Sequence, residues 1–215
     1  MKWRCPVFAL ACLVFPGAAA AHPHVLVDVN LEIMRNPAGQ MTELRHVWRF
    51  DELFSSTVML DFDTDGDGEL SHDELEEVSK TVTQSIGEQD FFTEVRLKGE
   101  TVKFTPPPKI MVSYADGQIL MFFAETFNQP VPVESGSLLI SVSDPTYFVA
   151  MEIADESAIQ ITGNGAACKA SIIRPDFDKL YSQNSAALTE EFFANPKASK
   201  LGDQWMTWIN LNCTS

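Results

Sequence analysis

The segment from residue 63 to residue 74 reads DTDGDGELSHDE and carries the most specific pattern in the chain. Three aspartates stand at alternate positions, as Asp63, Asp65 and Asp67, and Glu74 closes the segment. Carboxylates at this spacing can converge on one hard cation, and a glutamate at the last position can bind it through both oxygens. The pattern therefore indicates a turn built around a cation, with an acidic solvated turn before a capped helix as the alternative.

The same residues fit the calcium-binding loop of an EF-hand at every constrained position. Gly68 occupies position 6, where the chain turns sharply, Glu69 offers its backbone carbonyl from position 7, and Ser71 at position 9 can hold a water molecule. A loop that started at Asp61 would have His72 at position 12, where a glutamate is required, so this register does not fit. In the register that starts at Asp63, His72 is at position 10 and is not an expected ligand. The predicted calcium ligands are Asp63, Asp65, Asp67, Glu69, Ser71 and Glu74.

The number of EF-hand loops indicates whether the expected calcium ion is structural or regulatory. Signalling EF-hands usually occur in pairs, whereas this sequence contains a single loop of this kind. Extracellular modules bind calcium at roughly 10⁻⁴ to 10⁻³ M, where the ion is abundant. We therefore expect a permanent structural ion, with a regulatory ion as the alternative.

Residues on either side of the loop predict two helices. Asp51 is a suitable N-cap for a helix over residues 52–62, and a second helix is expected from about residue 71 to residue 84. Ser71 and Glu74 also have the spacing of a capping box. The loop is therefore expected to lie between two helices.

Most of the remaining chain predicts strands. Residues 24–34 and 41–50 flank an Asn-Pro-Ala-Gly turn and predict a hairpin, and from residue 93 onward the apolar period is two. Further strands are expected at 93–97, 102–104, 110–114, 119–127, 137–142, 146–153, 158–161 and 171–173. We predict an α+β fold with an N-terminal β-hairpin, an EF-hand-like helix–loop–helix, and then an antiparallel β-sandwich or partly closed barrel.

The expected division of the chain follows these segments. Residues 1–21 are expected to be a signal peptide, and residues 22–92 the hairpin with the EF-hand helix pair. Residues 93–173 are the β-sandwich region, and residues 174–215 a polar flap with a disulfide-tied C-terminal segment. Residues 22–215 can also form a single domain.

The first residues have the pattern of an export signal. Lys2 and Arg4 precede an apolar run at 7–15, and Ala19 and Ala21 are the small residues that a signal peptidase needs. The run is too short to span a bilayer, and no later segment reaches the roughly 18 apolar residues of a transmembrane helix. We expect secretion into a bacterial periplasm. A lipid anchor on Cys12 is the alternative, although the preceding residues match a lipoprotein box poorly.

The charge of the chain excludes one class of function. Lys and Arg number 15 against 30 Asp and Glu, so the formal net charge is −15. Such a surface repels phosphate backbones, which excludes nucleic-acid binding through a basic patch and disfavours anionic membrane surfaces. It attracts cations instead.

Two cysteines remain after removal of the signal peptide, Cys168 and Cys213. In an oxidising compartment an isolated pair is most simply one disulfide, which would tie the end of the chain to the β-rich region. A two-cysteine metal site would need further soft ligands nearby, and the sequence shows none.

Cleavage after residue 21 would expose His22-Pro23-His24 as a new terminus. Its amine and two imidazoles suit zinc, copper or nickel. If the hairpin turn is centred near residue 38, His24 lies opposite Asp51 or Glu52, and either carboxylate could complete a mixed site. A frayed terminus that binds metal incidentally is the alternative.

Several motifs occur together: His22-Pro23-His24-Val25, Trp48-Arg49-Phe50-Asp51-Glu52, the acidic loop, Phe91-Phe92, and Ser143-Asp144-Pro145-Thr146-Tyr147-Phe148. In this combination the chain resembles a family of periplasmic proteins described as the periplasmic component of an uncharacterised ABC-type transport system. Its members often sit beside nickel, cobalt or zinc permeases. The resemblance extends to about Cys168 and implies assistance in metal uptake, with its signature at His22, His24, Asp51 and Glu52.

Two functions follow. The first is a periplasmic accessory protein that binds zinc, nickel or cobalt, passes it to an inner-membrane permease, and carries one calcium ion. The second is a calcium-stabilised module that docks on a membrane partner without binding a transition metal. An enzyme is not expected, because His46 and the Ser55-Ser56 pair are the only candidates and nothing in the sequence brings them together.

Overall fold

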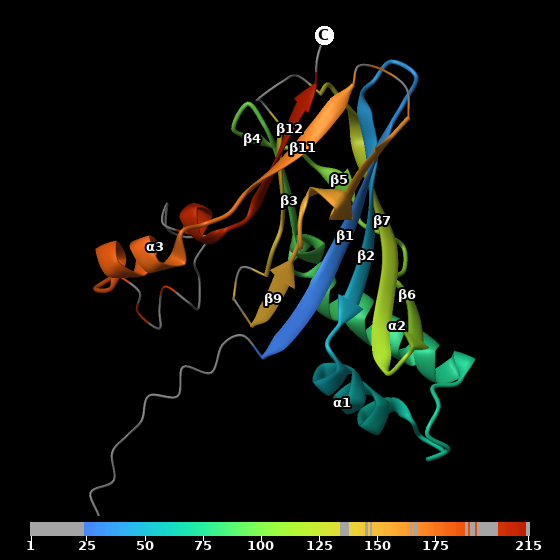
Figure 1. The fold of residues 1–215 in the computed structure, drawn as a ribbon. Helices are drawn as coiled ribbons and strands as arrows, with labels where there is room; N and C mark the ends of the chain where they lie inside the picture. Colours follow the sequence, from blue (N-terminus) through green and yellow to red (C-terminus); the bar gives the residue numbers. More distant parts are fainter. Residues whose placement is uncertain are drawn as a thin grey trace, which may run out of the picture.

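The computed structural model describes residues 24–133, 138–144, 146, 148–163, 165, 167–187, 189, 192 and 202–213. The expected signal peptide and His22 lie outside these residues. The described chain has an α+β fold in which two β-sheets and three α-helices account for most of the regular structure (Figure 1). The helices are α1 (Glu52–Phe62), α2 (His72–Gly87) and α3 (Phe177–Asn184), with short 3-10 turns η1 (Asp90–Phe92), η2 (Glu156–Ala158) and η4 (Gly202–Trp205).

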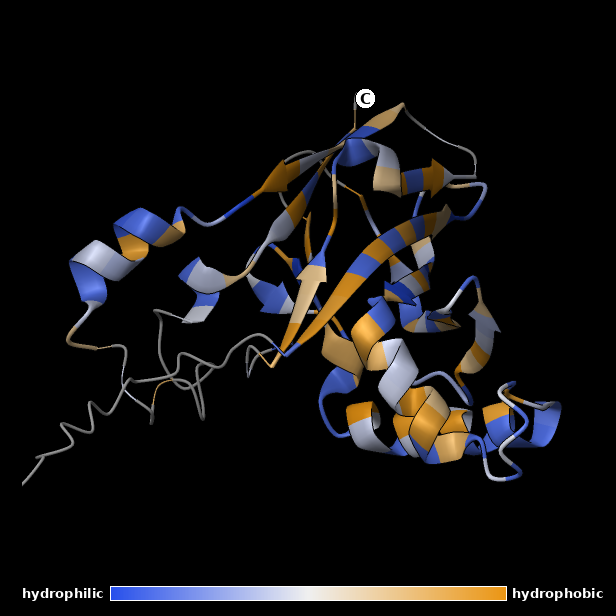
Figure 2. Ribbon diagram, turned by 60° about the horizontal axis from the view of Figure 1, so that its bottom comes forward, coloured by the Kyte–Doolittle hydropathy of each residue, from blue (hydrophilic) through white to orange (hydrophobic). Residues whose placement is uncertain are grey.

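The first sheet is built on the predicted hairpin of β1 (Val25–Arg35) and β2 (Met41–Phe50). Buried apolar residues alternate along β1 with more exposed ones, and Figure 2 shows this alternation as stripes along the strand. The strand order is β10-β1-β2-β7-β5, with β6 also on β7 and β9 also on β1. The added strands are β5 (Phe104–Thr105), β6 (Met111–Ala115), β7 (Gln118–Val131), β9 (Val149–Glu152) and β10 (Ile159–Thr162).

Two pairs in this sheet are parallel, β1 with β9 and β1 with β10. We expected only antiparallel pairing, so this part of the prediction is wrong. Before β9 the chain runs through a strand of the other sheet. It then returns to the first sheet, where β9 pairs with β1 and runs in the same direction as β1. Such a crossover allows parallel pairing, which a short hairpin turn cannot produce.

The second sheet has the order β11-β12-β8-β3-β4, and all its pairs are antiparallel. Its strands are β3 (Thr93–Leu97), β4 (Glu100–Thr101), β8 (Leu138–Val142), β11 (Cys168–Ile173) and β12 (Trp208–Cys213). The sequence did not predict β12, although it lies inside the sheet. Neither sheet closes on itself among the described strands, so this part of the chain holds no closed barrel.

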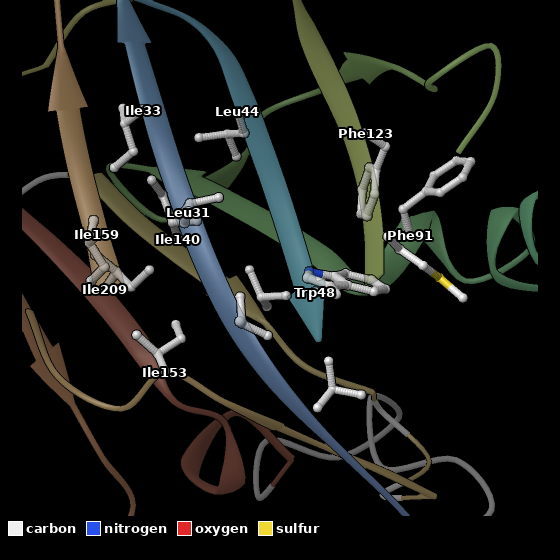
Figure 3. Close-up of a cluster of buried hydrophobic side chains, with 14 of the residues drawn as sticks. Leu31, Ile33, Leu44, Trp48, Phe91, Phe123, Ile140, Ile153, Ile159 and Ile209 are labelled. Carbon is white, nitrogen blue, oxygen red and sulfur yellow. The ribbon is translucent and has the colours of Figure 1, made fainter. Parts of the chain in front are cut away.

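One hydrophobic core receives side chains from both sheets. Figure 3 shows Leu31 and Ile33 of β1 near Ile140 and Ile209 of the second sheet. At one side Trp48 packs edge-on against Phe123, with ring centroids 4.7 Å apart. The chain passes between the two sheets several times, and both sheets bury side chains in this one core.

The helices α1 and α2 lie at one end of the first sheet, where α1 contacts β7 and α2 contacts β6 (Figure 1). Buried serines attach both helices to the neighbouring chain by hydrogen bonds. Ser55 accepts a hydrogen bond from the Ile119 amide (2.9 Å), and Ser79 donates to the Ile110 carbonyl. None of the helices in the described part of the chain has the length and hydrophobicity needed to cross a bilayer.

Candidate metal centre

The acidic loop lies between α1 and α2, as predicted. Helix α1 is capped by Asp51, whose side chain accepts a hydrogen bond from the Phe54 amide (2.9 Å). Helix α2 is capped by Ser71, and the capping box with Glu74 is present. The two helices therefore hold both ends of the loop in defined positions.

Three carboxylates converge inside the loop. Asp63, Asp65 and Asp67 each offer an oxygen, and these oxygens all lie within 4.8 Å of one another. Asp63 is oriented by the chain around it, because it accepts hydrogen bonds from the Gly66 amide (2.8 Å) and the Gly68 amide (2.9 Å). Both glycines have positive φ, of 73° and 83°, a conformation that favours glycine.

Glu74 joins the last position of the loop to its second. One carboxylate oxygen accepts from the Thr64 amide (2.6 Å) and hydroxyl (2.8 Å), and the other from the Ser71 amide (2.9 Å) and hydroxyl (2.9 Å). These hydrogen bonds, with that of the Ser71 amide the strongest influence, lower the pKa of Glu74 from 4.5 to about 2. Glu74 is therefore ionised at neutral pH and accepts hydrogen bonds from Thr64, which lies between Asp63 and Asp65 in the sequence.

The donor set consists of oxygen atoms only. Carboxylate oxygens are ligands that a hard cation such as calcium prefers, whereas zinc and nickel favour nitrogen and sulfur. Among the residues that the structure describes, Asp63, Asp65 and Asp67 are the only three metal-ligating side chains that come together in this way. The arrangement could hold a hard divalent cation.

The N-terminal residues are placed differently from the sequence-based expectation. A β-bulge between Met34 and Arg35 shifts the hairpin register by one residue, so that Val27 lies opposite Phe50. Leu26, and not His24, therefore lies beside Asp51, whose backbone amide donates to the Leu26 carbonyl (2.9 Å). The expected alignment of His24 with Asp51 or Glu52 assumed a regular turn and missed this bulge.

The side chain of Asp51 is engaged in local structure. Its oxygens accept from the Leu26 amide (2.8 Å) and the Phe54 amide (2.9 Å). Partial burial acts to raise the pKa of Asp51, but these amides outweigh it and leave the pKa below its ordinary value. The backbone amide of His24 donates to the Phe148 carbonyl, and the two rings lie 4.9 Å apart. Within the described part of the chain, His24, Asp51 and Glu52 do not form a three-ligand group.

Cys168 and Cys213 form the expected disulfide. They lie directly opposite each other on β11 and β12, at one end of the second sheet. The bond therefore ties an edge strand to its inner neighbour.

A buried ionisable pair was missed by sequence reasoning. The ring nitrogen Nε2 of His46 lies 2.9 Å from a carboxylate oxygen of Glu125, and both side chains are 0% exposed. The His46 ring also stacks on Phe123, at a centroid distance of 4.5 Å. The available signal was Glu125 itself, because it falls on the apolar side of an alternating strand that also contains Ile119 and Met121.

The serine named with His46 as a catalytic candidate has a structural contact. The Ser55 hydroxyl donates to the Asp51 carbonyl (2.7 Å) and accepts from the Ile119 amide. It is fully buried on α1. These contacts fix the helix on the sheet.

Comparison with known proteins places the chain in a family. A family model described as "Protein of unknown function (DUF1007)" matches residues 7–213. A protein of Haemophilus influenzae (strain ATCC 51907 / DSM 11121 / KW20 / Rd), named "Uncharacterized protein", is 26% identical over 171 residues, which cover 78% of this chain and 80% of that protein. Because the family match spans nearly the whole sequence, the chain belongs to the DUF1007 family.

Proposed function

We propose that the protein is a secreted, periplasmic module that binds one structural calcium ion in the loop of residues 63–74. The observation that carries this proposal is the convergence of Asp63, Asp65 and Asp67 to within 4.8 Å. Three carboxylates this close repel one another, and a divalent cation between them removes the repulsion. Calcium is the best match because every available donor is oxygen.

Glu74 would complete the coordination. Its oxygens accept from the Thr64 and Ser71 amides at the two ends of the loop, and binding the ion would exchange one or both of these contacts for the metal. The depressed pKa, about 2, keeps the group charged without any need for the metal. The closing ligand therefore needs no deprotonation before it binds the ion.

A structural role fits the anchoring of the two helices better than a switch. Ser55 fixes α1 to Ile119, and Ser79 fixes α2 to Ile110. Both serines are buried, so opening the helix pair would leave polar groups without partners. An ion in the loop would therefore stiffen the helix pair rather than separate it.

Calorimetric titration of the mature protein with calcium and magnesium tests the proposal. We expect one calcium site with a dissociation constant of about 10⁻⁴ to 10⁻³ M or tighter, and its loss in Asp65→Asn. Asp61→Asn is the matched control, because it removes an exposed charge from α1 just before the loop. Wild-type protein that binds no calcium at millimolar concentration, or equal binding by Asp65→Asn, would contradict the proposal.

The transition-metal function remains a prediction from the family resemblance. The described residues contribute His24 at the exposed start of the sheet, while Asp51 is committed to two amides. Zinc, nickel and cobalt titrations of mature protein, compared with a His22→Ala/His24→Ala variant, test it directly. Micromolar binding that disappears in the variant would support handover to a permease. Binding that the variant retains would rule out the histidine site.

A further inference from the structure

An arginine of the first sheet contacts the disulfide of the second. Nη1 of Arg35 donates a hydrogen bond to Sγ of Cys168 over 3.1 Å. Arg35 is the last residue of β1, whereas Cys168 is the first residue of β11. The contact therefore joins strands that are far apart in sequence and belong to different sheets.

The backbone of Arg35 is closely packed against the chain that leads into β11. Gly163 and Gly165, just before β11, have φ values of +96° and +117°. A Cβ on Gly163 would lie 2.1 Å from the Arg35 carbonyl oxygen, and a Cβ on Gly165 would lie 2.8 Å from Cα of Gly39. Only glycine fits at either position, because Gly163 lies directly against the Arg35 backbone and Gly165 against the β1–β2 turn.

A guanidinium in contact with a sulfur changes the chemistry of that sulfur. A neighbouring cation stabilises a thiolate relative to its thiol. In thiol–disulfide exchange, the sulfur with the more stable thiolate leaves faster. Both cysteines are partly exposed, so a small thiol can reach the bond. The guanidinium contact is made to Cys168, which distinguishes the two sulfurs chemically.

We propose that Cys168–Cys213 is a redox-exchangeable disulfide in which Cys168 is the leaving thiolate and a dithiol reductant is the partner. A thiolate of the reductant attacks Sγ of Cys213 and forms a mixed disulfide. The bond to Cys168 breaks, and its electron pair stays on Cys168 beside Arg35.

The second thiol of the reductant then completes the exchange. It loses its proton, attacks the reductant's own sulfur in the mixed disulfide, and releases Cys213 as a thiolate that takes up a proton. The reductant becomes a disulfide, and the protein gains a Cys168 thiolate and a Cys213 thiol. Two electrons are transferred, and the proton that the first reductant thiol lost passes to solvent. Reduction would remove the covalent tie between the edge strand β11 and β12.

The first experiment identifies the sulfur that leaves. Folded, oxidised mature protein is treated briefly with reduced glutathione, its free thiols are trapped with N-ethylmaleimide, and peptides are mapped by mass spectrometry. We expect glutathione on Cys213 and the maleimide on Cys168. The reverse assignment, an even distribution, or no reaction before unfolding would overturn the proposal.

The second experiment tests Arg35 through the rate of reduction by dithiothreitol. We expect Arg35→Gln to be reduced about three to ten times more slowly than wild type, and Arg35→Lys to retain most of the rate. Arg49→Gln is the matched control, because it removes an exposed arginine from the neighbouring strand near the opposite end of the hairpin.

The direction of the change in reduction rate distinguishes stabilisation of the Cys168 thiolate by Arg35 from a purely structural role of Arg35. If Arg35 only held the segment in place, its loss would expose the sulfurs and speed reduction. An unchanged or faster rate in a folded Arg35→Gln variant would therefore overturn the proposal. If that variant does not fold by circular dichroism, the glutathione assignment on wild-type protein still decides the question.

Discussion

The carboxylate of Glu74 accepts hydrogen bonds from Thr64 at one end of the loop and from Ser71 at the other. Its pKa falls from 4.5 to about 2 because these donors favour the charged form. A group with a depressed folded-state pKa stabilises the protein above its unfolded pKa, and this stabilisation is lost as the pH falls towards the folded value.

We therefore expect the calcium-free protein to lose stability between about pH 4.5 and pH 2, with part of that loss due to Glu74. Urea unfolding across this range should show a shallower dependence in Glu74→Gln. Glu77→Gln, an exposed change on the same helix, should leave the slope as in wild type. Identical slopes for wild type and Glu74→Gln would show that the hydrogen bonds do not persist in solution.

The His46–Glu125 pair gives a second prediction at this scale. Removing one partner leaves a buried polar group alone, so Glu125→Leu should lower the free energy of unfolding by about 3 to 5 kcal/mol. The double variant His46→Leu/Glu125→Leu should recover much of that loss, because no unpaired group remains. Chemical denaturation of the wild type, the two single variants and the double variant measures these changes in the free energy of unfolding. The exposed pair of Arg45 and Glu43 is the control, and Glu43→Gln should cost less than about 1 kcal/mol.

At the scale of elements, local signals were sufficient for the helices and for one hairpin. The N-caps Asp51 and Ser71 determined where α1 and α2 begin, and a cap acts within a few residues of itself. Asp116 and Gly117 have φ values of +54° and +79°, the left-handed pair that joins β6 to β7. These elements could be predicted because their determinants are adjacent in sequence.

Elements that depend on distant partners could not be predicted in the same way. Strand β12 lies between β11 and β8, and its conformation depends on pairing with segments remote in the chain. The parallel pairing of β1 with β9 likewise depends on a crossover through the other sheet. Periodicity indicates that a segment is a strand but gives no information about the direction of its neighbour.

The attachment of α1 to the sheet can be tested with adjacent serines. Ser55→Ala removes the acceptor of the buried Ile119 amide and should destabilise the protein by about 1 to 3 kcal/mol. Ser56→Ala is matched, because its exposed hydroxyl donates only to the Glu52 carbonyl within the same helix. Urea denaturation should separate the two variants clearly. Equal effects would mean that the Ser55 contact contributes nothing beyond helix propensity.

At the scale of the whole molecule, calcium should raise the melting temperature by mass action. With a dissociation constant of about 10⁻⁴ to 10⁻³ M, calcium at about 10 mM should add about 1.4 to 2.7 kcal/mol to the stability of the folded state. This corresponds to a rise of about 3 to 10 °C over protein in chelator. Thermal melts with calcium, magnesium and chelator measure it. No rise, or an equal rise with magnesium, would argue against a structural calcium ion.

The candidate sites differ in how much of each could be predicted from the sequence. All predicted ligands of the loop lie within one short segment, so spacing alone could predict that Asp63, Asp65 and Asp67 come together. The N-terminal site depended on hairpin alignment, and a single bulge after Met34 changed that alignment. The pairing of His46 with Glu125, and the contact of Arg35 with Cys168, join distant strands and required the folded sheets.

The position of β12 has a consequence for biogenesis. Because β12 follows both of its neighbours in the chain and lies between them, β8 keeps a bare edge while the polypeptide is still emerging. Unpaired edges of this kind recruit other extended chains. A nascent copy would therefore need a chaperone or rapid completion of the chain to avoid intermolecular pairing, and truncation before residue 208 should produce aggregates instead of a shortened domain.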